Sequence, residues 1–174
     1  QAPPGAYPKA WGEGLPADYA MDSTVVGENG LTEALVPIPS ISLALNPDDM
    51  FGKENGIYVN TEHDGVAWER AASVEWIDPA GGVEFQVEAG LRIQGRSSRK
   101  PPTSPKHSFR LLFKTAYGPG TLRFPIFGDE GPEEFETLVL RATSNNSWTF
   151  PLVEQRERAQ YLRDAWAKDT QRAM

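Results

Sequence analysis

The sequence predicts an α+β fold, in which a mainly antiparallel sheet of about six strands is followed by a C-terminal amphipathic helix. Gly and Pro together contribute 31 of the 174 residues, which indicates many turns and short strands. Several segments alternate apolar and polar residues with the period of two expected of strands, and only the last segment has helical spacing. With 39% hydrophobic residues, the chain is long enough to bury the core of one domain.

Residues 1–36 are expected to form an extended, Pro-rich N-terminal arm, because prolines and glycines interrupt any periodicity there. Tyr7, Trp11, Tyr19 and Met21 make this arm too apolar for a free linker. We therefore predict an extended arm that packs on the domain, and we expect these four residues to bind a partner. Trp and Tyr are also common anchors of protein interfaces.

The folded part is predicted to begin at residue 37. A first strand spans about 38–45 and ends at the turn signal of residues 46–48. Residues 72–78 and 83–93 alternate strictly on either side of a Pro and Gly turn, so they are expected to be strands. Residues 108–114 should return antiparallel to the second of these, with Phe109, Leu111 and Phe113 on one face. The result is a hairpin with a wide loop at its tip.

The remaining elements follow this hairpin. Residues 121–127 predict a short strand interrupted by Pro125, and residues 137–142 a buried strand. From Pro151 an apolar stripe at helical spacing predicts one helix docked on the sheet. The stripe consists of Val153, Ala159, Leu162, Ala165, Trp166 and Ala173.

A basic segment stands out in an otherwise acidic chain. Residues 91–114 contain seven Lys or Arg and no acidic residue, which leaves ten basic residues against 24 acidic ones elsewhere. Charge clustered in this way commonly positions an anionic partner or a phosphate. A pI of about 4.9 and the absence of aromatic residues inside the loop argue against nucleic acid.

Other function classes are disfavoured by residue content. The chain has no Cys, which excludes disulfides and thiolate metal sites, and no apolar run reaches the roughly 20 residues of a membrane-spanning helix. His63 and His107, the two histidines, lack the spacing of metal ligands, so we expect no metal site. The start QAPPGAYP is typical of a mature exported chain after signal-peptide removal, which predicts a periplasmic or extracellular location.

Six ordered segments carry a family resemblance: residues 38–60 (IPSISLALNPDDMFGKENGIYVN), 90–98 (GLRIQGRSS), 105–114 (PKHSFRLLFK), 124–129 (FPIFGD), 138–148 (LVLRATSNNSW) and 161–174 (YLRDAWAKDTQRAM). Together they resemble the CotH (spore-coat protein H) kinase-like family, as found in large exported proteins of environmental bacteria. The resemblance implies an atypical kinase that uses ATP and Mg, with residues 37–174 as its N-terminal lobe. It also places the catalytic carboxylates beyond Met174, so no catalytic residue is assigned and the lobe is expected to be incomplete at its C-terminus.

The candidate phosphate-binding residues are Gly95, Ser97, Ser98, Lys106 and Arg110. Backbone N–H groups and Ser hydroxyls of such a loop can approach phosphates, while the two cations supply charge. Protein kinases likewise hang a loop over phosphates and place a Lys on the next strand. The alternative is a solvated hairpin tip that is basic only to protect a sheet edge.

Asp164 on the terminal helix is the candidate carboxylate that would align the strand Lys, as a helix carboxylate does in kinases. A surface salt bridge is the simpler interpretation.

Two functions therefore remain open. The chain is either the nucleotide-lobe half of a CotH-like kinase, inactive alone and without productively bound ATP and Mg, or an exported, non-catalytic structural and interaction subunit built on the same fold. In either case the expected partner is another protein subunit or a C-terminal half.

Overall fold

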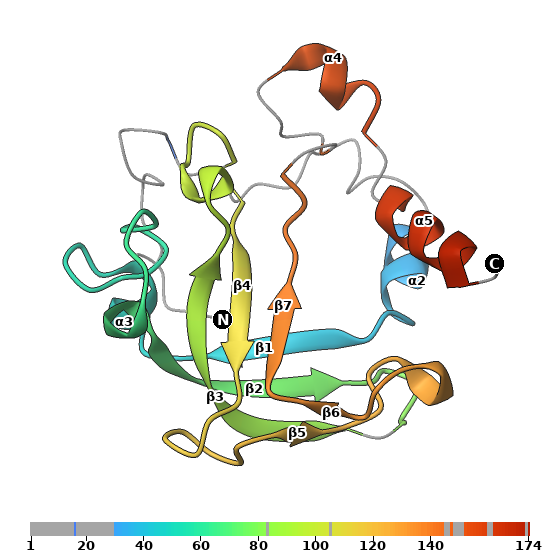
Figure 1. Ribbon diagram of the computed structural model, residues 1–174, viewed down its shortest axis with the longest axis horizontal. Helices are drawn as coiled ribbons and strands as arrows, with labels where there is room; N and C mark the ends of the chain where they lie inside the picture. The colour runs from blue at the N-terminus through green and yellow to red at the C-terminus, as the bar shows by residue number, and fades with distance from the viewer. Residues whose placement is uncertain are drawn as a thin grey trace.

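The computed structural model describes residue 16 and residues 30–82, 84–104, 106–144, 147, 152–159, 162–172 and 174. The chain forms an α+β fold around a five-stranded, fully antiparallel sheet of order β1-β2-β3-β4-β7 (Figure 1). The strands are β1 (Ser40–Ala44), β2 (Arg70–Ile77), β3 (Phe85–Gln94), β4 (Ser108–Leu112) and β7 (Thr137–Leu140). A separate two-stranded ladder joins β5 (Leu122–Arg123) to β6 (Glu134–Phe135).

Helices are short. They are α2 (Leu31–Leu35), α3 (Pro47–Phe51), α4 (Val153–Arg156) and α5 (Arg163–Arg172), with single 3-10 turns η1 (Val66–Trp68), η2 (Ser97–Arg99) and η3 (Gly128–Glu130). The turn signal at residues 46–48 starts α3, because the Asn46 side chain accepts a hydrogen bond from the Asp48 N–H at 2.9 Å and Pro47 fits the first turn. None of the described helices is long and apolar enough to cross a membrane.

The alternation seen in the sequence gives the sheet two unlike faces. One face is apolar and carries the core residues Val74, Ala89, Leu91, Ile93 and Leu111. The β5–β6 ladder packs on this face, where the Phe124 ring meets the rings of Trp76 and Phe85 at centroid distances of 5.8 and 4.8 Å.

The segment after α3 also covers the apolar face. Ile57 is 2% exposed, and the Tyr58 ring packs 5.9 Å from Phe109 of β4. Burial of about ten apolar side chains between these layers supplies the main driving force for folding.

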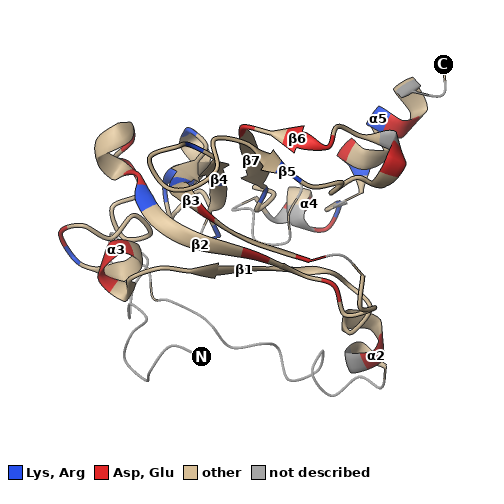
Figure 2. Ribbon diagram, turned by 90° about the horizontal axis from the view of Figure 1, so that it is seen from below, with Lys and Arg blue, Asp and Glu red and all other residues tan. Residues whose placement is uncertain are grey.

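The predicted hairpin is confirmed. β3 runs without a break through Gly90 and pairs with β4 in the expected antiparallel sense, with Leu91 opposite Leu111. The basic residues between these strands form the loop of residues 95–107, which we call the basic loop. Figure 2 shows Lys and Arg around β3 and β4, whereas Asp and Glu mark β6 and α3.

Two details of the sequence prediction are wrong. The segment 137–142 is not a buried strand: β7 spans Thr137–Leu140 at the edge of the sheet, and Val139 is 47% exposed. The single docked helix is instead α4 and α5, and Leu162 and Trp166 beside and on α5 are 77% and 71% exposed. The reason is that half of the stripe is Ala, which offers little apolar area to hold a helix on a sheet.

The predicted N-terminal arm lies largely outside the described residues, and so do Tyr7, Trp11, Tyr19 and Met21. Of residues 1–29, Pro16 alone is described, as an exposed residue in an isolated β-bridge.

Candidate functional site

The second face of the sheet is polar, and we call it the polar face. The strand register extends one row beyond the Arg70–Leu91 pair, which places Glu69 beside Arg92, and Arg92 is directly opposite Arg110 of β4. Ser108 and Lys114 lie on the same side of β4 and its extension, because successive side chains of a strand alternate between faces. Charged residues from three segments thus meet on one surface.

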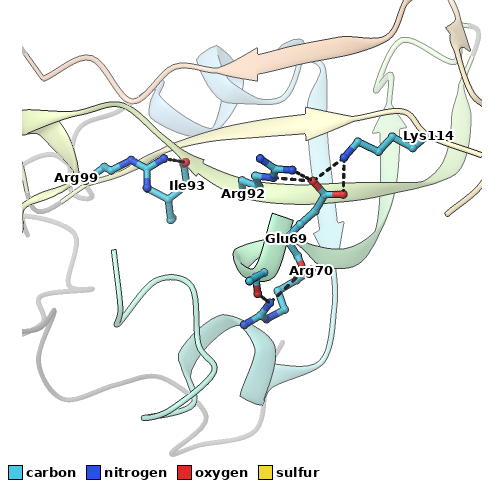
Figure 3. Close-up of polar contacts among 7 residues, drawn as sticks. Glu69, Arg70, Arg92, Ile93, Arg99 and Lys114 are labelled. Atoms are coloured by element: carbon cyan, nitrogen blue, oxygen red, sulfur yellow. Dashed lines mark hydrogen bonds and ion pairs between the residues drawn. The ribbon is translucent and has the colours of Figure 1, made fainter. Parts of the chain in front are cut away.

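Glu69 is the centre of this surface, and its side chain is 2% exposed. The Lys114 ammonium lies 2.9 Å from both carboxylate oxygens, and the Arg92 Nε donates a hydrogen bond of 2.6 Å to Oε2. Figure 3 shows both cations converging on the carboxylate from neighbouring strands. The two cations compensate much of the cost of burying the charge.

Tyr117 completes the cluster and affects its titration. Burial by itself would raise the pKa of Glu69, but hydrogen bonds from Lys114, Tyr117 and Arg92 outweigh it, so the pKa is lowered from its ordinary value. Burial and the adjacent Glu69 carboxylate raise the pKa of Tyr117. At neutral pH the cluster therefore holds an ionised carboxylate and a neutral phenol.

Gly90 provides the space for this cluster. A Cβ atom at residue 90 would lie 2.8 Å from the Tyr117 ring and 2.9 Å from the Glu69 carboxyl carbon. Any side chain there would push these two groups apart, so the absence of one on the polar face of β3 is a steric requirement of the cluster.

The basic loop is held from within by Arg99. Its guanidinium donates to the carbonyls of Gly95 at 2.7 Å, Ile93 at 2.8 Å and His63 at 2.8 Å. Figure 3 shows the contact with Ile93. Gly95 has φ +129°, a conformation that favours glycine, and a Cβ there would lie 2.4 Å from the Ser98 Oγ. Arg99 is therefore a structural residue that orders the loop.

His107 closes the loop from its other end. Its side chain is buried, with Nδ1 3.3 Å from the Ser98 carbonyl, and Nε2 has no hydrogen-bond partner among the residues that the structure describes. Because a carbonyl only accepts, Nδ1 carries the proton of the neutral ring. Burial lowers the pKa of His107, and the hydrogen bond to Ser98 opposes this only in part.

The five candidate phosphate-binding residues belong to the basic loop and to β4. Gly95, Ser97 and Ser98 share the first turn of the basic loop, where Ser97 is exposed and Ser98 is half-buried. Lys106 is exposed at the other end of the loop, whereas Arg110 lies on the polar face of β4.

Asp164, the candidate aligning carboxylate, forms an ion pair with Arg141, and both side chains are about half exposed. The strand Lys that does pair with a carboxylate is Lys114, and its partner is Glu69. The alternation of residues 108–114 indicates the face on which Lys114 lies, but no local sequence signal identifies Glu69, which precedes β2 and is 45 residues away.

Among the described residues, no group of three or more His, Cys, Asp or Glu is placed to hold a metal ion. The cations of the polar face are of the kind that binds phosphate oxygens.

No protein-family model, curated protein or solved structure matches this chain.

Proposed function

We propose that this chain is the amino-terminal, nucleotide-lobe part of a CotH-like atypical kinase, which contributes phosphate-binding cations but not the catalytic carboxylates. The observation that carries the proposal is the ion pair of Lys114 with the buried carboxylate of Glu69 on the polar face, which also carries Arg92 and Arg110. In protein kinases a strand Lys is held by a carboxylate and contacts the nucleotide phosphates, under a flexible loop.

The geometry supports a binding role in particular. Glu69 fixes the ammonium of Lys114 at 2.9 Å, so the cation is already oriented when a ligand arrives and loses little freedom on binding. The Lys114 side chain is 38% exposed, which leaves room for a phosphate to approach it. ATP, when bound, would supply the phosphoryl group, and the residues of this chain would only bind and orient it.

Calorimetric titration with ATP tests the proposal. We expect saturable binding that Lys114→Met weakens at least tenfold, because one phosphate contact is lost. Lys53→Met is the matched control, since Lys53 is exposed on the connection after α3, and it should leave the affinity unchanged. Absence of ATP binding to the folded chain, or equal weakening by both variants, would contradict the proposal.

The chain alone is expected to transfer no phosphoryl group, because in-line transfer needs carboxylates to hold metal and orient the acceptor, and none is assigned. Incubation of the 174-residue chain with labelled ATP and Mg checks this expectation. Label incorporated into protein, or metal-dependent release of phosphate, would refute it.

A second candidate function is a non-catalytic structural and interaction subunit. It is favoured by Leu162 and Trp166, which are largely exposed at α5, because large apolar side chains on a surface often mark protein contacts. Sedimentation velocity would show a concentration-dependent increase in mass that Trp166→Ser abolishes. A monomer at all concentrations, with and without the substitution, would argue against association of the chain with itself. Deletion of residues 1–22 would test whether the N-terminal arm contributes to binding of a candidate partner.

A further inference from the structure

Arg110 is a cation on the polar face whose charge no described residue balances. It is half-buried, and its buried Nε has no hydrogen-bond partner within the described part of the chain. No hydrogen bond or ion pair joins its guanidinium to any described residue. Buried donors are normally satisfied, so an unsatisfied one indicates a missing acceptor.

The neighbouring residue increases the need for an anion. Arg92 is directly opposite Arg110 in the β3–β4 ladder, where side chains lie about 5 Å apart at Cβ. Like charges at such positions repel, and burial reduces the screening by water. The sheet nevertheless places the two residues directly opposite each other on one face.

The nearby carboxylate is already used. Glu69 accepts a hydrogen bond from Arg92, and both of its carboxylate oxygens accept from the Lys114 ammonium. When Arg110 is included, the polar face therefore has one negative charge for three cations. With three cations and one carboxylate, the cluster of Glu69, Arg92, Arg110 and Lys114 has a formal net charge of about +2 at neutral pH. A dianion would neutralise it.

The neighbouring hydroxyl fits the same ligand. Ser108 lies two residues before Arg110 on the same face of β4, and its Oγ accepts a hydrogen bond of 2.9 Å from the Ala142 N–H. Its own proton is therefore free to be donated to an oxygen on the polar face.

We propose that Arg110 and Arg92, with the Ser108 hydroxyl, form a binding site for a phosphate-class dianion on the polar face of the sheet. The planar guanidinium of Arg110 would bind two oxygens of the ligand, as Arg commonly does with phosphate. The anion site stands on this geometry alone, whereas the assignment of its natural ligand as a nucleotide phosphate rests on the proposed function. It differs from a site at the loop tip, because Ser97 and Lys106 take no part in it.

Thermal unfolding with inorganic phosphate tests the site. We expect 20 mM phosphate, compared with chloride at about equal ionic strength, to raise the melting temperature of the native chain, since a ligand that binds only the folded state stabilises it. Arg110→Gln should abolish this rise and weaken phosphate binding at least tenfold. Arg110→Lys keeps the charge but not the fork of donors, so it should retain only part of the affinity.

Arg123→Gln is the matched control, because Arg123 lies on β5 in an exposed ion pair with Glu134, and it should leave the phosphate effect intact. An equal phosphate effect in the native chain and in Arg110→Gln, or equal loss in Arg110→Gln and Arg123→Gln, would overturn the site. If Arg110→Gln fails to fold, titration of Arg110→Lys with phosphate takes its place. An unchanged phosphate affinity in Arg110→Lys would then overturn the proposed site.

Comparison with ATP separates the two proposals. Binding of inorganic phosphate that depends on Arg110, with ATP bound no more tightly than phosphate, would support the anion site and contradict the nucleotide lobe. Tighter binding of ATP, also dependent on Arg110, would support both.

Discussion

Replacing Glu69 by glutamine removes the negative charge that Lys114 and Arg92 share, while the size of the side chain is nearly unchanged. The amide still offers one acceptor oxygen, but its NH2 group points donor hydrogens at a cation. Loss of one partner from a buried ion pair costs about 3–5 kcal/mol. The Lys114 side chain is 38% exposed and can be hydrated, so we expect a loss near the lower end, about 3 kcal/mol in the free energy of unfolding.

Urea unfolding at neutral pH measures this change for the native chain and for Glu69→Gln. The matched control is Glu134→Gln, which breaks an ion pair whose side chains are 62% and 77% exposed. Exposed pairs contribute about 0–1 kcal/mol, so this control should unfold almost like the native chain. A loss below about 1 kcal/mol for Glu69→Gln would refute the view that this carboxylate holds the polar face together.

The pH dependence gives a second check. Because the pKa of Glu69 is lowered in the folded state, its contribution is present above the ordinary pKa of a carboxyl group and is lost as pH falls through the lowered value. The difference in stability between native chain and Glu69→Gln should therefore shrink in acid. A difference that stays constant from pH 7 to pH 3 would show that the cost is steric and not electrostatic.

Three further changes have sharp expectations. Arg99→Gln should increase hydrogen exchange throughout the basic loop, because several carbonyls lose their donor. The control Arg96→Gln, at an exposed residue of the same loop, should leave the exchange unchanged, and equal exchange in the two variants would contradict this prediction. Since burial lowers the pKa of His107, the unfolded chain takes up the proton first, and stability should fall as pH drops below about 6.5. His107→Gln should remove this dependence and His63→Gln should leave it, as urea unfolding between pH 7 and pH 5 would show. Asp164→Asn should change the free energy of unfolding by less than about 1 kcal/mol, because the side chains of its ion pair with Arg141 are half exposed. A larger loss on urea unfolding would mean that this ion pair stabilises the packing of α5 on the sheet.

Much of the fold was predictable because the strands alternate cleanly. The period of two in residues 83–93 and 108–114 assigned the faces of β3 and β4 correctly, since an apolar row on one side has only one way to be buried. The C-terminal segment was less predictable. A helical period indicates that a helix forms, but Leu162 and Trp166 show that the period does not indicate whether the helix is covered.

The site was predictable only in part, for a physical reason. Charge clustering identified the basic segment, and alternation placed Arg110 away from the core. The role of Glu69 depends on contacts with Arg92 and Lys114, which lie 23 and 45 residues along the chain, and no periodic pattern records such contacts. The structural role of Arg99 was not predictable for a related reason, because its guanidinium donates to backbone carbonyls that only the folded loop brings within reach.

The anchoring of the basic loop by Arg99 has a consequence for how portable this segment is. The guanidinium reaches the carbonyl of His63, 36 residues earlier in the chain, so one of the acceptors that shape the loop lies outside the hairpin. A synthetic peptide of residues 91–114 would keep all seven positive charges and lose that anchor. Such a peptide would attract anions without selectivity, and grafting the hairpin onto another scaffold would transfer its charge but not its shape.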